Sequence, residues 1–291
     1  MRVLMFAMAF LICAPQATSA AMQKRAALLI GNGNYGALSL QNPGSDVTAL
    51  AASLARLGFK SQILRDADWQ TMVEALREFI TRTRDSEVRL IFFAGHGAQI
   101  RGKNYLVPVG ISINDEDDVT KRSIDVAEIL DRIGRLENGV NIVILDACRN
   151  NPMLTTKLTA DGRKIRVRGH QHGLAPVRAP AGTLVAFSTG PGNVADDNPK
   201  ALNSLYAKHL LSHIGTPGLT LEQLFKRIRV GVMQDSKNAQ RPWEESSLTV
   251  DFCFVAGANG ACPPAPQPRR FAARRCYLFY TRLASRHCSG R

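Results

Sequence analysis

Between residues 25 and 148, short apolar runs alternate with longer segments in which apolar residues recur every three or four positions. The short runs are typical of strands that are buried on both faces, and the longer segments are typical of amphipathic helices. The predicted strands span residues 25–30, 59–64, 88–94 and 142–145, and the predicted helices span residues 43–57, 69–84 and 124–136. This alternation predicts an α/β fold in which right-handed crossovers connect the strands of a parallel sheet.

The second half of the chain resumes this pattern after an interruption. Residues 153–180 are rich in glycine, arginine and lysine and lack periodicity, which is typical of a functional or disordered loop. The remaining predicted elements are a hairpin around 100–109, an acidic turn at 114–118, strands at 182–188 and 248–255, and helices at 204–213 and 219–235. We therefore predict one domain over residues 25–256, in which the basic loop joins a larger segment, 25–152, to a smaller one, 181–256.

The two ends of the chain lie outside this domain. Arg2, an apolar run at 3–14 and small residues at 18–20 predict that residues 1–21 are a cleaved signal peptide, so we expect a periplasmic or secreted protein. The apolar run is shorter than the roughly 20 residues of a spanning helix, and we expect no transmembrane segment after signal removal. Residues 257–291 are rich in proline and arginine and are interpreted as a C-terminal tail.

The net charge of +13 is concentrated in two places. Residues 153–178 carry six basic residues against one acidic residue, and residues 261–291 carry seven arginines and no acidic residue. Charge confined to a loop and a tail is typical of solvated chain, whereas a nucleic-acid interface needs a basic face and stacking aromatics. We therefore expect no nucleic-acid partner.

Five cysteines remain once Cys13 leaves with the signal peptide, and five is an odd number. In an oxidising compartment, two disulfides among the last four cysteines would leave Cys148 as a free thiol. These four are Cys253, Cys262, Cys276 and Cys288. Three pairings are possible, and the alternative is a disordered tail whose cysteines are unpaired.

Two reactive side chains follow predicted strands. His96 comes just after the strand at 88–94, and Cys148 comes just after the strand at 142–145. Because ligands of open α/β sheets bind outside the carboxyl ends of the strands, this thiol and this imidazole are candidate catalytic groups. Residues 31–36 also spell the glycine pattern of dinucleotide-binding loops, but the next helix is predicted to begin only at Pro43, which argues against nucleotide binding.

Several motifs give the chain a family resemblance. They are A-G-H-G at 94–97, L-D-A-C-R-N-N-P at 145–152, A-L-L-I-G-N-x-x-Y at 27–35, N-Y-L-V-P-V at 104–109 and R-P-W-E-x-S-S-L at 241–248. In this order they resemble the bacterial caspase-like cysteine peptidases, which are metacaspase and orthocaspase relatives of the caspase family. The resemblance covers roughly residues 25–256. It implies a caspase-like three-layer sandwich, with a mostly parallel six-stranded sheet flanked by helices.

The resemblance also implies a cysteine endopeptidase in which His96 and Cys148 form a catalytic dyad. A thiol attacks a peptide carbonyl as a thiolate, and a neighbouring imidazole can lower its pKa and then protonate the leaving amine. The backbone N–H groups of Gly97 and Cys148 are the candidate oxyanion hole. The alternative function is a catalytically silent caspase-like module that binds peptides or partner proteins.

Specificity is also implied by the family. Asp46 and Asp146 match the acidic positions through which metacaspase-like enzymes accept arginine or lysine, so the expected partners are protein or peptide substrates with basic residues. Ala94 stands where many metacaspases have serine. The basic loop lies where caspase-like enzymes join their two segments, so Arg163, Lys164, Arg166 and Arg168 are candidate self-cleavage sites.

No cofactor is required for this chemistry, but calcium activates many metacaspases. The acidic residues Asp115, Glu116, Asp117 and Asp118 could supply oxygen ligands for calcium, although solvated acidic turns are commoner. His209 and His213 have the spacing of a zinc-binding helix, but Leu210 occupies the position at which that motif requires glutamate. We therefore expect no metal site in the catalytic machinery. The sequence does not indicate an oligomeric state.

Overall fold

The computed structural model describes residues 24–113, 115–136, 138–148, 157–158, 164–165, 174–190, 201–258, 260 and 262. Its centre is a sheet with the strand order β10-β9-β6-β3-β1-β2. In chain order these strands are β1 (Arg25–Gly31), β2 (Phe59–Arg65), β3 (Val88–Ile100), β6 (Val140–Cys148), β9 (Thr183–Phe187) and β10 (Trp243–Ser246). All pairs along this path are parallel except β9 with β10, so the predicted fold class is confirmed.

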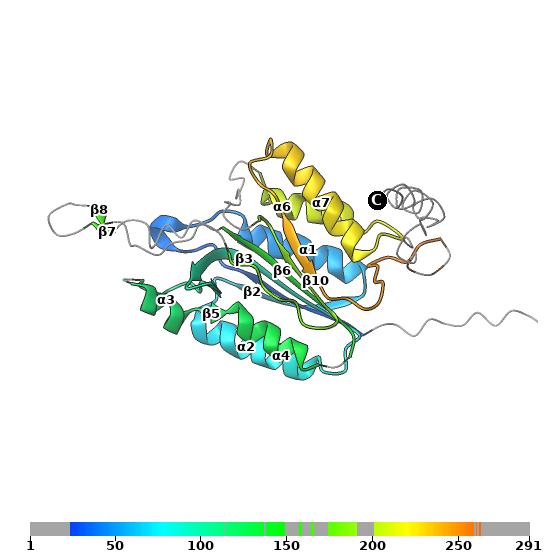
Figure 1. Cartoon of the computed structure of the whole chain (residues 1–291), viewed down its shortest axis with the longest axis horizontal. Coiled ribbons are helices and arrows are strands. Elements are labelled where there is room, and N and C mark those ends of the chain that lie inside the picture. Colours follow the sequence, from blue (N-terminus) through cyan, green and yellow to red (C-terminus); the bar gives the residue numbers. More distant parts are fainter. Residues whose placement is uncertain are drawn as a thin grey trace, which may run out of the picture.

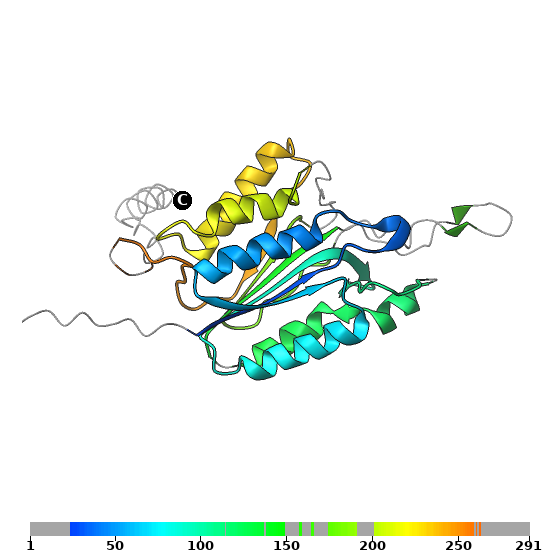
Figure 2. The ribbon, with the colours of Figure 1, turned by 180° about the vertical axis from the view of Figure 1, so that it is seen from behind.

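Two helical layers cover the sheet. On one face lie α1 (Pro43–Arg56), α6 (Leu205–His213) and α7 (Leu221–Asp235), and on the other lie α2 (Trp69–Arg82) and α4 (Val126–Gly134), as Figure 1 and its reverse view in Figure 2 show. Successive residues of β3 alternate between the two resulting cores. Leu90 and Phe92 pack in the α1 layer, and Ile91 and Phe93 pack in the α2 layer. Burial on both faces explains why this strand is a continuous apolar run.

The strand β3 continues beyond its predicted end at residue 94. Its last four residues pair antiparallel with β4 (Lys103–Leu106), which in turn pairs with β5 (Ile124–Asp125). The turn between β3 and β4 holds Arg101 and Gly102, both with positive φ, at 51° and 77°. The predicted hairpin is therefore confirmed, and it extends the sheet past the point where the parallel strands end.

Two local predictions are wrong. The last strand is β10, not residues 248–255. That stretch buries Phe252, Cys253 and Phe254 without strand pairing beyond a single bridge from Cys253 to Thr220. The acidic turn is the start of a helix, α3 (Glu116–Arg122), which Asp115 caps.

Within the basic loop, β7 (Lys157–Leu158) pairs with β8 (Lys164–Ile165). Two-residue strands are too short to leave a periodic pattern in the sequence.

The C-terminal end of the domain is closed by a disulfide. Cys253 and Cys262 are bonded to each other, which is one of the pairings that the cysteine count allowed. Residues 1–21 and Cys276 and Cys288 of the tail lie outside the described residues. None of the described helices is long and apolar enough to cross a membrane.

Candidate active site

The two candidate catalytic residues lie on neighbouring strands. The strands β3 and β6 are parallel and adjacent, and their register pairs His96 with Cys148 at the end of the ladder. The strand ends that carry them point to the carboxyl edge of the sheet, beyond β1 and β9. The sheet register therefore brings together two residues that are distant in sequence, as the motif positions predicted.

The imidazole of His96 is buried and held on two sides. It is 4% exposed, and its Nε2 lies 2.7 Å from the carbonyl oxygen of Leu38. Because a carbonyl can only accept a hydrogen bond, Nε2 carries the proton, and Nδ1 is then the basic nitrogen of the neutral ring. The ring of Tyr35 packs against the imidazole with centroids 4.4 Å apart. These contacts fix both the orientation and the tautomer of the histidine.

Tyr35 also connects two backbone segments of the site through hydrogen bonds. Its hydroxyl accepts a hydrogen bond from the His96 N–H at 3.2 Å and donates one to the Val107 carbonyl at 2.8 Å. The Val107 N–H in turn donates to the His96 carbonyl at 3.0 Å. The sequence motif that contains Tyr35 pointed to the family, but it assigned no role to this residue. Its role depends on a contact between the loop after β1 and the end of β3.

The glycines that flank His96 are required by close packing. Gly95 has a φ of 158°, and a Cβ there would lie 2.8 Å from both the Tyr35 hydroxyl and the Phe93 ring. At Gly97, a Cβ would lie 3.0 Å from that of Ala147. Gly97 is paired in register with Leu106 of β4, directly after the histidine. The A-G-H-G motif thus allows three chain segments to approach one another at this edge.

Two carboxylates meet beside the dyad. Asp46 comes from the first turn of α1 and Asp146 from β6, two residues before Cys148. Ser204 connects them: its hydroxyl donates to Asp146 Oδ2 at 2.5 Å, and its backbone N–H donates to Asp46 Oδ1 at 3.1 Å. The side-chain amide of Asn203 also donates to Asp46 Oδ1, at 2.8 Å. Both predicted substrate-binding residues therefore lie together, next to the register pair of His96 and Cys148.

The electrostatics of this carboxylate pair are unfavourable without a cation. Asp46 is 1% exposed and Asp146 is 7% exposed. Burial, followed by the charge of Asp146, raises the pKa of Asp46 to about 7, although hydrogen bonds from Asn203 and Ser204 oppose the shift. The second oxygen of Asp46, Oδ2, is buried and accepts no hydrogen bond from any described residue. A positively charged group that entered here would relieve the repulsion and stabilise both carboxylates.

Sequence reasoning did not identify Ser204, Asn203 or the neighbouring Tyr206. Ser204 caps α6 through a hydrogen bond from the Ala207 N–H, so its place before a predicted helix was a usable signal for a cap. Its link to both carboxylates is a tertiary contact that no local pattern encodes. Burial, and then the charge of Asp146, raise the pKa of the Tyr206 hydroxyl well above its usual value, so this phenol stays neutral beside the carboxylates.

Cys148 and Leu174, which flank residues 149–173, both lie at this edge of the sheet. The side chain of Leu174 lies close to Gly97. Asn104 of β4 holds the next residue, Ala175, through two hydrogen bonds with its backbone, at 2.8 and 2.6 Å. Of the candidate cleavage residues, Lys164 is in β8, and Arg163, Arg166 and Arg168 lie outside the described residues.

The acidic residues proposed as calcium ligands are engaged within the chain. Asp115 caps α3 by accepting from the Asp118 N–H. Glu116 and Asp117 lie within 3.8 Å of the Arg101 guanidinium, and Asp117 also pairs with Lys121. Among the described residues, no group of three or more His, Cys, Asp or Glu side chains is arranged to hold a metal ion. Calcium activation stays a prediction.

Comparison with known proteins gives a consistent result. A family model described as the caspase domain matches residues 24–253. The human protein "Mucosa-associated lymphoid tissue lymphoma translocation protein 1" is 33% identical over 126 residues, which are 43% of this chain and 15% of that protein. Its mouse homologue is 32% identical over the same shares of the two chains. The matched region thus spans under a sixth of the length of these relatives.

Proposed function

Because the chain belongs to the caspase-domain family, we propose that it is a cysteine endopeptidase that cleaves after arginine or lysine. The observation that carries the specificity is the buried pair of Asp46 and Asp146, joined through Ser204 beside the register pair of His96 and Cys148. A buried carboxylate pair needs a compensating cation, and a guanidinium can bind carboxylates through two parallel hydrogen bonds.

The proposed reaction follows from the tautomer of His96. Nδ1 takes the proton of the Cys148 thiol, and the thiolate sulfur attacks the carbonyl carbon of the scissile bond. The backbone N–H groups of Gly97 and Cys148 stabilise the resulting oxyanion, an interaction type worth about 3 kcal/mol. As the C–N bond breaks, the imidazolium returns the proton to the leaving amine, and water then hydrolyses the thioester. The Leu38 carbonyl supports the imidazolium through its bond to Nε2.

Self-processing would be a consequence of this specificity. Most of the basic loop lies between Cys148 and Leu174, and both of these residues are at the candidate active site, because Cys148 pairs in register with His96 and Leu174 lies close to Gly97. The arginines and lysines of this loop have the chemistry that Asp46 and Asp146 would select. We propose cleavage within 163–168, in a protein that is exported after removal of residues 1–21.

Active-site labelling tests whether the chain is an enzyme or a silent binding module. A peptide that carries arginine next to a thiol-reactive acyloxymethyl ketone should add one mass equivalent to the wild-type protein, on Cys148. Cys148→Ala protein should remain unlabelled, and the aspartate analogue of the peptide should label the wild type far more slowly. Equal labelling by both peptides would refute the proposed specificity. Binding of the peptide without modification of Cys148 would support the silent module.

A further inference from the structure

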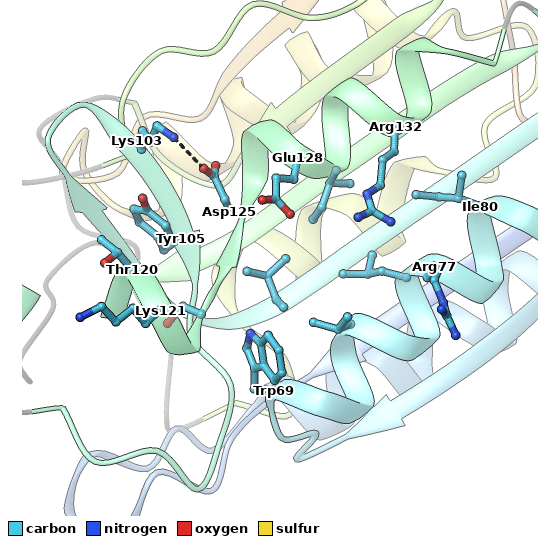
Figure 3. A pocket seen from close by; sticks show the side chains of 15 residues that line it. Trp69, Arg77, Ile80, Lys103, Tyr105, Thr120, Lys121, Asp125, Glu128 and Arg132 are labelled. Carbon is cyan, nitrogen blue, oxygen red and sulfur yellow. Dashed lines mark hydrogen bonds and ion pairs between the residues drawn. The ribbon is translucent and has the colours of Figure 1, made fainter. Parts of the chain in front are cut away.

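A groove runs between α2 and α4, on the face of the sheet that does not carry α1, α6 and α7. One part of it is a cavity of about 400 Å³, which residues of β4 and β5 line at one end. The apolar floor consists of Val73, Leu76, Ile80, Ile124 and Ile129. Figure 3 shows the two helices as its long walls, with Trp69 near one end and Ile80 near the other.

The groove continues along the same two helices. A second hollow, of about 530 Å³, shares Arg77, Ile80 and Arg132 with the first and extends to the carboxyl ends of both helices. We name the two hollows together the α2–α4 groove. Trp69 is 43% exposed at the end nearer the carboxyl edge of the sheet, although it is a large apolar side chain. An exposed tryptophan beside an apolar hollow is typical of a site that a partner covers.

The rim of this groove is basic. Arg77 of α2 and Arg132 of α4 border both hollows, and Arg132 extends over the groove in Figure 3. Neither guanidinium makes an ion pair or a side-chain hydrogen bond with any residue in the part of the chain that the structure describes. Farther along, the second hollow adds Arg84 and Arg135.

The acidic side chains of the groove do not cancel this charge. Asp125 pairs with Lys103 at 3.2 Å, and its other oxygen caps α4. Asp131, just outside the hollows, pairs with Arg135 at 2.7 Å. The remaining acids among the described lining residues are Glu128 and Asp85. They are outnumbered by three cations, which are Arg77 and Arg132, both without an ion-pair partner among the described residues, and the adjoining Arg84. The groove thus combines an apolar floor with a rim that favours anions.

The undescribed segments of this chain are poor occupants for such a groove, and residues 1–23 and 149–156 contain no acidic residue at all. Residues 263–291 carry seven arginines and no acidic residue, and the undescribed parts of the basic loop are also predominantly basic. The segment 191–200 contains only Asp196 and Asp197 as acids, together with Lys200. Charge complementarity therefore points to a different molecule.

We propose that the α2–α4 groove docks an acidic amphipathic segment of another protein. Apolar side chains of that segment would cover the floor and Trp69, and its carboxylates would pair with Arg77 and Arg132. Arginine and tryptophan are among the residue types that contribute most to such interfaces. The groove lies on a different layer from Asp46, so this docking function does not depend on the proposed cleavage specificity.

Trp69 provides a direct readout. Because the chain has two tryptophans, Trp243→Phe in a full-length Cys148→Ala background leaves Trp69 as the single fluorophore. The probe is a synthetic amphipathic helix with leucines on one face and glutamates on the other. Its addition should change Trp69 emission saturably. Added salt should raise the dissociation constant, because part of the attraction is between exposed charges.

Charge variants identify the groove as the site. The double variant Arg77→Glu/Arg132→Glu should raise the dissociation constant at least about tenfold, because two attractive pairs become repulsive. The double variant Arg77→Gln/Arg132→Gln should raise the dissociation constant less. It removes the charges without reversing them, and it keeps the test valid if the glutamate variant fails to fold. The matched control reverses the charges of Lys226 and Arg227, two cations of α7 on the opposite layer. It should leave the dissociation constant of the peptide within about twofold of its original value.

Three results would overturn the proposal. The first is no saturable change with the glutamate peptide. The second is equal binding of a peptide in which lysines replace the glutamates, which would indicate an apolar site without charge selection. The third is an unchanged dissociation constant in both the Arg77→Glu/Arg132→Glu and the Arg77→Gln/Arg132→Gln proteins, which would place binding elsewhere.

Discussion

At the scale of single residues, the proposed chemistry depends on side chains that the motifs identified and on partners that they did not. The positions of His96, Cys148, Asp46 and Asp146 could be predicted, because each belongs to a motif or to a helix start. The contact of Leu38 with His96 and the contacts of Ser204 with both carboxylates could not, because they join residues that are distant in sequence. Their roles arise only when separate segments meet at the edge of the sheet.

The raised pKa of Asp46 predicts how stability depends on pH. In the unfolded chain this carboxyl has a pKa near 3.8, and in the folded protein burial and Asp146 raise the pKa to about 7. Folding therefore disfavours its ionised form, so the free energy of unfolding should fall as pH rises from about 4 to about 7. Asp46→Asn should remove this part of the pH dependence. Urea unfolding at several pH values, in a Cys148→Ala background, measures the free energy of unfolding with and without Asp46→Asn. The same pH dependence in both proteins would contradict a raised pKa of Asp46.

Tyr35 is predicted to position His96 rather than to react. Tyr35→Phe keeps the ring contact with the imidazole but removes the hydrogen bonds to His96 N–H and the Val107 carbonyl. We expect kcat on an arginyl peptide to fall about tenfold with little change in KM, because a misplaced imidazole affects the chemical step. Restored activity in Tyr35→His protein, or an unchanged kcat in Tyr35→Phe, would argue against positioning by the hydroxyl.

At the scale of elements, the alternation of apolar runs predicted the parallel core well. It did so because strands buried on both faces and amphipathic helices leave distinct periods in sequence. The last strand was misplaced because residues 248–255 are apolar for another reason: Phe252 and Phe254 pack into the α1 layer without strand pairing. The true edge strand, β10, has only half-buried or exposed residues and therefore no apolar run.

Close packing at the end of β3 predicts intolerance to a single methyl group. Gly95→Ala would place a Cβ 2.8 Å from the Tyr35 hydroxyl and the Phe93 ring, at a φ that favours glycine. We expect a loss of about 1–3 kcal/mol of stability together with most of the activity. Gly215→Ala is the matched control, because no atom lies within 4 Å of its added Cβ. The unfolding temperature and the rate of peptide hydrolysis should both be lower in Gly95→Ala than in Gly215→Ala.

At the scale of the whole molecule, one sheet edge collects the candidate catalytic and specificity groups. The register of β3 with β6 pairs His96 with Cys148, and α1 and α6 supply Asp46 and Ser204 to the same edge. The fold class followed from the sequence pattern and the family motifs. The α2–α4 groove could not be predicted, because it is a property of how two helices lie side by side on the opposite layer.

The disulfide should stabilise the closing segment of the domain. It joins Cys253 to Cys262 across nine positions of sequence, which corresponds to roughly 2–3 kcal/mol in the loop-entropy model. Cys262→Ser should therefore lower the unfolding midpoint, and reductant should lower the wild-type midpoint to a similar value. Peptide mapping without reductant checks the pairing. Recovery of Cys148 in a disulfide in the native protein would contradict its role as nucleophile.

Selection of basic residues by the buried carboxylates can be measured as kcat/KM across a peptide series that differs only at the residue before the scissile bond. We expect a strong preference for arginine and lysine over aspartate and no turnover by Cys148→Ala. For the arginine peptide, kcat/KM should fall at least about 100-fold in Asp46→Asn and in Asp146→Asn. Preferential cleavage after aspartate, or unchanged arginine turnover in both carboxylate variants, would contradict this selection.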